Sequence, residues 1–176
     1  MYAGHVGFAL GAYSFRRTLP LWLLIVAAQA PDWLDAGYCI ANVGRGPYGL
    51  FTHGVIAIAA AAITFAVITY AVSRDPLGAL IVAAVVISHY GLDYFTGHKP
   101  TWAGGPVVGL NLYTRPIADV IIESITVLGG WLLYRHSLPR AVRDDGMVYG
   151  ILFSLIALQA VAGIVYALNM TGHVKC

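Results

Sequence analysis

The sequence has very little charge for its length. Only 10% of its 176 residues are Asp, Glu, Lys or Arg, whereas hydrophobic residues make up 59%. A soluble domain typically carries about 25% charged residues, because water must solvate its surface. The shortage therefore argues against a soluble enzyme and against a disordered chain. The formal net charge of +2 is also too small to indicate a nucleic-acid partner.

Cysteine is equally scarce. Cys39 and Cys176 are the two cysteines of the chain, and no CxxC pair is present. Two isolated thiols give neither a disulfide framework nor a thiolate metal site. An iron–sulfur or other soft-metal centre therefore has no support in the sequence.

Long apolar runs dominate what is present. A helix needs about 20 mostly apolar residues to cross a bilayer. The longest apolar runs are Leu50–Val72, Leu77–Phe95, Ile117–Tyr134 and Val148–Asn169. The shorter runs Tyr2–Phe15 and Leu19–Asp35 predict a tight helical hairpin packed against these four. We expect an all-α integral membrane protein, a single domain over residues 1–176 with about five to six transmembrane or partly inserted helices.

Small residues follow one face of the first run. Ala3, Gly7 and Gly11 recur at every fourth position. Such a stripe lets one helix approach another closely inside a membrane. The many glycine and alanine residues are compatible with a monomer and with a homo-oligomer.

The arginines predict an orientation. With six alternating segments, one face of the membrane receives Arg16, Arg17, Arg74, Arg135, Arg140 and Arg143. The other face receives Arg45, Lys99, Arg115 and Lys175. The positive-inside rule places the first face in the cytoplasm and the long connections 36–49 and 96–116 outside.

Ionisable residues gather at the ends of the apolar runs that face outward in this topology. They are His5, Asp32, Asp35, His53, His89, Asp93, His98, Asp119 and Glu123. Each ionisable group costs at least about 2.5–3.5 kcal/mol inside a membrane, so a layer of them predicts a functional site. His89 and Asp93 share one helix face at i, i+4, and Asp119 and Glu123 repeat that spacing.

A divalent metal is the simplest way to hold this layer together, since imidazole and carboxylate are ligands of zinc, manganese and iron. Three structural alternatives remain open. His89 and Asp93 could form a simple hydrogen bond, and Asp119 and Glu123 could pair with Arg115 or Lys99. Asp32, which follows Pro31, could end a helix.

The order of these motifs resembles a known family. The run His5, Pro31-Asp32, Thr52-His53 and Ser88-His89-xxx-Asp93 is similar to the bacterial inner-membrane, metal-dependent hydrolases. The downstream pieces His98-Lys99-Pro100, Gly109-Leu110 and Glu123 resemble one branch of it. The resemblance covers residues 4–135 and leaves the helix over 148–169 outside it. It implies a bacterial or archaeal cytoplasmic membrane protein whose site lies on the extracytoplasmic side.

The ligand order is more distantly similar to that of zinc-dependent phospholipase C and the related single-strand nucleases. That similarity implies one sub-site from His53, His89, Asp93 and an aspartate of the Asp32/Asp35 pair, with His5 nearby. It implies a second sub-site from His98, Asp119 and Glu123. Asp119 stands where those proteins have histidine, which favours manganese or magnesium there, whereas zinc is the first expectation elsewhere. We expect about one to three ions.

The resemblance also implies roles. Asp35 is the candidate general base, and Lys99 and Arg115 are candidates for contacting a phosphate. The leading hypothesis is a membrane-embedded hydrolase of a phosphoester, such as a lipid phosphate or a phospholipid headgroup. A metal- or proton-coupled transporter is the first alternative, although the cytoplasmic halves look dry and no internal repeat is found. A structural subunit with a metal staple is the second alternative.

Overall fold

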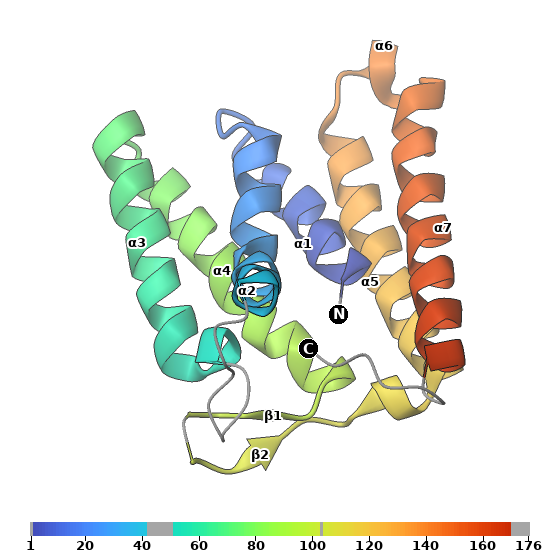
Figure 1. Ribbon diagram of the computed structural model, residues 1–176. Coiled ribbons are helices and arrows are strands. Elements are labelled where there is room, and N and C mark those ends of the chain that lie inside the picture. The colour runs from blue at the N-terminus through green and yellow to red at the C-terminus, as the bar shows by residue number, and fades with distance from the viewer. Residues whose placement is uncertain (1, 42–50, 103, 170–176) are drawn as a thin grey trace.

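The computed structural model describes residues 2–41, 51–102 and 104–169, and these ranges are almost entirely helical (Figure 1). They form seven α-helices, two short 3-10 turns and one two-stranded sheet. Four helices are long and apolar enough to cross a membrane, namely α3 (Val55–Ser73), α4 (Pro76–Thr96), α5 (Pro116–Ser137) and α7 (Gly146–Asn169). The prediction of an all-α membrane protein is confirmed.

The two N-terminal helices differ from the predicted hairpin in length. α1 (Ala3–Tyr13) has 11 residues, which at about 1.5 Å per residue spans roughly half of a bilayer core. α2 (Leu21–Ile40) does not end after Asp35 but continues for five more residues, with Pro31 inside it. Asp32 therefore lies within a helix, and the alternative that it ends one is wrong.

The small-residue stripe of α1 packs against α5. A Cβ added at Gly7 would lie 2.6 Å from the Cα of Val127, and one added at Gly130 would lie 1.7 Å from the carbonyl oxygen of Gly7. Real side-chain carbons do not approach backbone atoms so closely, so the two helices touch along their main chains. The predicted close approach is present, and its partner is α5 and not only the neighbouring α2.

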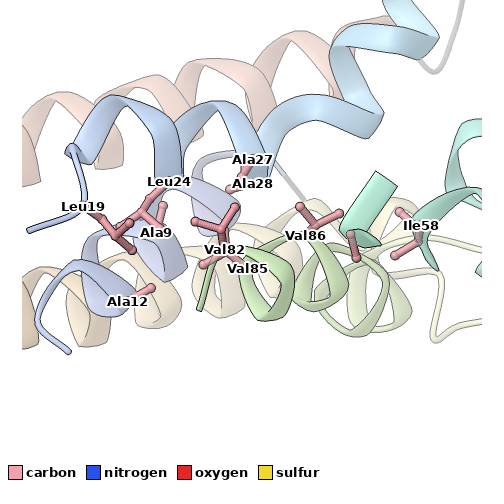
Figure 2. Close-up of a cluster of buried hydrophobic side chains, with 11 residues drawn as sticks. Ala9, Ala12, Leu19, Leu24, Ala27, Ala28, Ile58, Val82, Val85 and Val86 are labelled. Atoms are coloured by element: carbon pink, nitrogen blue, oxygen red, sulfur yellow. The ribbon is translucent and has the colours of Figure 1, made fainter. Parts of the chain in front are cut away.

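Two apolar clusters form the interior, and α1 contributes to both. Figure 2 shows the first, which joins α1, α2, α3 and α4 through Ala9, Ala12, Leu19, Leu24, Ala27, Ala28, Ile58, Val82, Val85 and Val86. The second joins α1, α5 and α7 through Ala3, Leu10, Val127, Trp131, Val148 and Leu152. α1 is therefore the shared wall between the two halves of the bundle.

A small hairpin that the sequence did not predict closes one end of the bundle. β1 (Lys99–Pro100) pairs antiparallel with β2 (Val107–Val108), and the 3-10 turn η2 (Leu112–Thr114) leads into α5. Gly109 follows with a φ of 122°, and a Cβ there would lie 2.2 Å from the carbonyl oxygen of Gly97. Glycine is thus required where the chain folds back under the end of α4.

The other end of the bundle carries the arginine-rich connections. There α6 (Arg140–Arg143) lies far from the hairpin (Figure 1). Arg16 donates a 2.7 Å hydrogen bond to Asp75, which ties the α1–α2 turn to the α3–α4 turn and holds the pKa of Asp75 below its usual range. Arg45 and Lys175, which entered the orientation argument, lie outside the described residues.

Candidate metal centre

Five of the predicted ligands meet at the hairpin end of the bundle. His5 comes from α1, Asp32 from α2, His53 from the 3-10 turn η1 (Phe51–His53), and His89 and Asp93 from α4. Within His5, His89 and Asp93 one ligand atom of each lies within 4.8 Å of the others, and the same holds for Asp32, His53 and His89. His89 belongs to both sets, so it stands at the centre of the cluster.

His89 is oriented by a backbone group. Its Nδ1 donates a 2.8 Å hydrogen bond to the carbonyl oxygen of Ala28, which can only accept. The neutral ring therefore keeps a lone pair on Nε2, which has no hydrogen-bond partner. This atom lies 3.3 Å from Asp93 Oδ2 and 3.7 Å from Asp32 Oδ1. A neutral His89 thus presents a lone pair to two carboxylate oxygens that also contact Lys99 and His53. Such a set of nitrogen and carboxylate oxygen is suited to hold a cation.

Pro31 explains why α2 can supply that carbonyl. A proline inside a helix lacks the N–H of its own position and opens the preceding turn, so carbonyls of that turn need other partners. Ala28 lies in this turn and accepts from His89. The missing N–H directly affects the carbonyl of Ala27, and Ala28 is the next residue of the same turn. The Pro31-Asp32 pair thus follows the turn whose carbonyl orients one histidine, and it places a carboxylate beside another.

His53 shows the same arrangement. Thr52 Oγ1 lies 2.8 Å from its Nδ1, so the ring is fixed from the side away from the carboxylates. Its Nε2 lies 2.9 Å from Asp32 Oδ1 and 3.6 Å from Asp93 Oδ2. Burial lowers the pKa of His53 despite the opposing effect of Asp32. A lowered pKa favours the neutral imidazole, the form that binds metals.

His5 completes the cluster from the opposite side. Its ring stacks on that of His89 with a centroid distance of 3.8 Å and an interplanar angle of 13°. Its Nε2 lies 3.3 Å from Asp93 Oδ1, and its Nδ1 is buried without a hydrogen-bond partner. The alternative of a single His89–Asp93 hydrogen bond therefore does not account for the site, because four other side chains contact this pair. They are His5, Asp32, His53 and Lys99.

Lys99 also belongs to the cluster. Its ammonium pairs with Asp93 Oδ2, and the hairpin carries it there from β1. Beside this pair lies a cavity of about 10 Å³ lined by His53, Tyr90, Asp93, Tyr94, Lys99 and Val108. That volume is close to the minimum for one water molecule. A lysine, a water-sized space and three imidazoles thus converge on Asp93.

The second predicted sub-site is brought together only in part, since Asp119 and Glu123 line one cavity without His98. His98 is exposed, and neither group of converging ligands among the described residues includes it, Asp119 or Glu123. Glu123 Oε2 accepts the backbone N–H groups of Tyr2 and Gly4 at 3.0 and 3.1 Å, so it caps the start of α1. Of the remaining predictions, Asp35 lies within α2 and Arg115 is exposed just before α5.

Two participants escaped the sequence reasoning, and a third, Lys99, was assigned a different contact. The carbonyl of Ala28 carries no side-chain signal, although Pro31 nearby hinted at a freed backbone group. Lys99 was expected to contact a phosphate, and its pairing with Asp93 depends on the unpredicted hairpin. Gln159 interrupts the last apolar run, and its amide donates to Asp119 Oδ2 at 3.4 Å. A lone polar residue in an apolar run is the signal that could have singled out Gln159.

No protein-family model, curated protein or solved structure matches this chain. The likeness to the hydrolase family therefore rests on the order and spacing of its motifs, and it stays a prediction.

Replacing Lys99 by methionine is expected to raise the affinity for Zn²⁺ about ten-fold, because the metal no longer has to displace an ammonium from Asp93. A hydrogen bond to a charged group contributes about 1.5–3 kcal/mol, and about 1.4 kcal/mol is a factor of ten. Competition with a fluorescent chelator measures the change on detergent-purified protein. Arg115→Met is the control, since it removes one positive charge at the same end. An unchanged or weaker affinity for Zn²⁺ in Lys99→Met would contradict the idea that the metal and the Lys99 ammonium compete for Asp93.

Proposed function

We propose that the chain is a membrane-embedded, metal-dependent hydrolase of a phosphoester, such as a lipid phosphate or a phospholipid headgroup. The observation that carries the proposal is the convergence of His89 Nε2 with two carboxylate oxygens, Asp93 Oδ2 at 3.3 Å and Asp32 Oδ1 at 3.7 Å. His5 and His53 add two further imidazoles. A donor set of nitrogen and carboxylate oxygen suits zinc first, and manganese as the alternative.

A divalent ion held by these residues would supply a Lewis acid and a water of lowered pKa. The chain's own residues provide the rest. Water attacks phosphorus, the new O–P bond forms, and the P–O bond to the leaving alkoxide breaks. Asp35 takes the proton of the water, and that proton leaves with the alkoxide as an alcohol. The ammonium of Lys99 pairs with Asp93 in the structure. With a metal ion bound to Asp93, this ammonium would be released to contact the phosphate of the substrate.

The position of the cluster favours a lipid substrate. His89 and Asp93 lie in the last turns of α4, which is long and apolar enough to cross the membrane, and the hairpin follows this end of the helix (Figure 1). An ester at this depth reaches the cluster while its acyl chains stay beside the apolar helices. The arginines at the opposite end support an orientation with the cluster on the extracytoplasmic side. The bacterial or archaeal cytoplasmic membrane follows from the resemblance to the hydrolase family.

Lipid nanodiscs provide the test. Protein reconstituted with phosphatidic acid, phosphatidylethanolamine or phosphatidylglycerol, and supplied with Zn²⁺ or Mn²⁺, is expected to release phosphate or a phosphorylated headgroup. Asp93→Asn should lower the rate by at least about 100-fold, since losing even a supporting group of a metal site costs about 10–100-fold. Asp144→Asn, which alters an exposed carboxylate at the other end, should leave the rate unchanged.

Three outcomes would overturn the proposal. Intact lipids with both metals, in wild-type protein and in Asp93→Asn alike, would remove the hydrolase. Metal-dependent flux into sealed vesicles without hydrolysis would put the transporter in its place. Metal bound in stoichiometric amount without either activity would leave the structural staple.

A further inference from the structure

A second polar cavity opens at the same end of the bundle. It lies between α5, α7 and the start of α1, and its volume is about 110 Å³. Its polar lining consists of Tyr2, Tyr113, Asp119, Glu123 and Gln159. One water needs about 10–15 Å³ of such volume, so this cavity has room for a group of several heavy atoms. The metal cluster shares none of these residues.

The cavity is lined by acceptors that lack donors. Asp119 and Gln159 are 5% and 2% exposed, and the buried atoms Asp119 Oδ1 and Gln159 Oε1 have no hydrogen-bond partner among the described residues. The Nε2 group of Gln159 donates a hydrogen bond to Asp119 Oδ2, which orients the two side chains relative to each other. A buried acceptor without a hydrogen bond costs about 1–3 kcal/mol of stability, and a charged acceptor costs more. Two such oxygens side by side therefore indicate a missing donor.

The two carboxylates of the cavity are not equivalent. Glu123 accepts the backbone N–H groups of Tyr2 and Gly4, so the partial positive charge at the start of α1 already compensates it. Asp119 accepts only from a neutral amide in the described part of the chain. Among the described residues, the cavity thus offers one carboxylate without a charged hydrogen-bond donor and one neutral amide oxygen.

We propose that this cavity binds an ammonium group, with Asp119 and Gln159 accepting its hydrogen bonds. Hard divalent ions take six or more oxygen ligands, often several of them carboxylates, and one free carboxylate falls short of that set. The space also exceeds what a bare ion fills, whereas an ammonium on a short carbon chain uses it. The rings of Tyr2 and Tyr113 line the same cavity and are suited to contact such a cation.

The ammonium has two sources, a lipid headgroup and a free amine. Ethanolammonium chloride titrated into detergent-purified protein is expected to raise the unfolding temperature in a saturable way. Sodium chloride at equal ionic strength should not. Asp119→Asn and Gln159→Leu should each raise the half-saturating concentration about ten-fold or more, since each removes an acceptor from a charged donor. Asp144→Asn removes the same charge at an exposed position and should behave as wild type.

Nanodiscs then separate the sources. If the response to ethanolammonium disappears in phosphatidylethanolamine but persists in phosphatidylglycerol, the lipid headgroup occupies the cavity. An equal response in both lipids assigns the cavity to a free amine. Either result supports an ammonium site.

The proposal fails if sodium stabilises as well as ethanolammonium, if no saturable stabilisation occurs, or if both cavity variants respond as wild type does. Gln159→Leu keeps the test decisive if Asp119→Asn does not fold, because leucine suits the surrounding apolar helix. His89→Ala should retain the full response. The ammonium site therefore stands or falls independently of the metal-dependent hydrolase.

Discussion

Protein carrying His89→Ala is expected to purify without stoichiometric metal, whereas wild-type protein holds at least about one equivalent of Zn, Mn or Fe per chain. His89 is common to both groups of converging ligands, so its removal breaks both. It also leaves the carbonyl of Ala28 without its donor. Inductively coupled plasma mass spectrometry of detergent-purified protein measures the change, before and after reloading with metal.

Two further variants sharpen the result. His136→Ala removes an exposed histidine at the opposite end and should keep the full metal content. Glu123→Ala tests the second sub-site, because metal lost there would mean that Glu123 ligates an ion in addition to capping α1. Wild-type protein that takes up no metal after reloading, or His89→Ala that keeps all of it, would contradict the metal centre.

The second large effect is expected at the contact between α1 and α5. Gly130→Leu should lower the free energy of unfolding by more than about 3 kcal/mol, the upper range for overpacking, because the first added carbon would lie 1.7 Å from the carbonyl oxygen of Gly7. No side-chain rotation relieves a clash between a Cβ and the main chain. Thermal unfolding in detergent, followed by tryptophan fluorescence, gives the measurement.

Gly129 provides a matched control. It precedes Gly130 in α5, but a Cβ there meets nothing within 4 Å. Gly129→Leu should therefore unfold at the temperature of wild type. Equal losses in the two variants would show that any side chain added on this part of α5, and not the contact with α1, sets the effect, because leucine is itself the better helix former. Gly130→Leu should also lose metal, because displacing α1 moves His5 away from Asp93.

The sequence predicted what depends on local pattern. Apolar length and the scarcity of charge were enough for an all-α membrane bundle, and the small-residue stripe was enough for a close contact. The His89-xxx-Asp93 spacing placed two ligands on one helix face, and the outer ends of the runs brought His5, Asp32 and His53 to the same layer. These are properties of single helices and of their direction through the membrane.

Contacts between distant segments were beyond that pattern. Glu123 caps α1 across 119 residues of sequence, and nothing near Glu123 announces a helix start. Lys99 reaches Asp93 because a hairpin turns the chain back under α4, with Gly109 in a conformation that other residues rarely adopt. α2 continues through Pro31 because packing against α1 and α4 outweighs the local preference to stop.

The capping of α1 by Glu123 has a consequence for biosynthesis. The ribosome makes α1 first. The carboxylate of Glu123, which caps α1, and Gly130, against which Gly7 of α1 packs, are both made later, as part of α5. A nascent chain that stops before α5 has already made all five converging histidines and aspartates, but it lacks the helix against which α1 settles. We therefore expect the cluster to form only after α5 has entered the membrane, so a stalled or shortened product would carry the five side chains without the helix that positions His5.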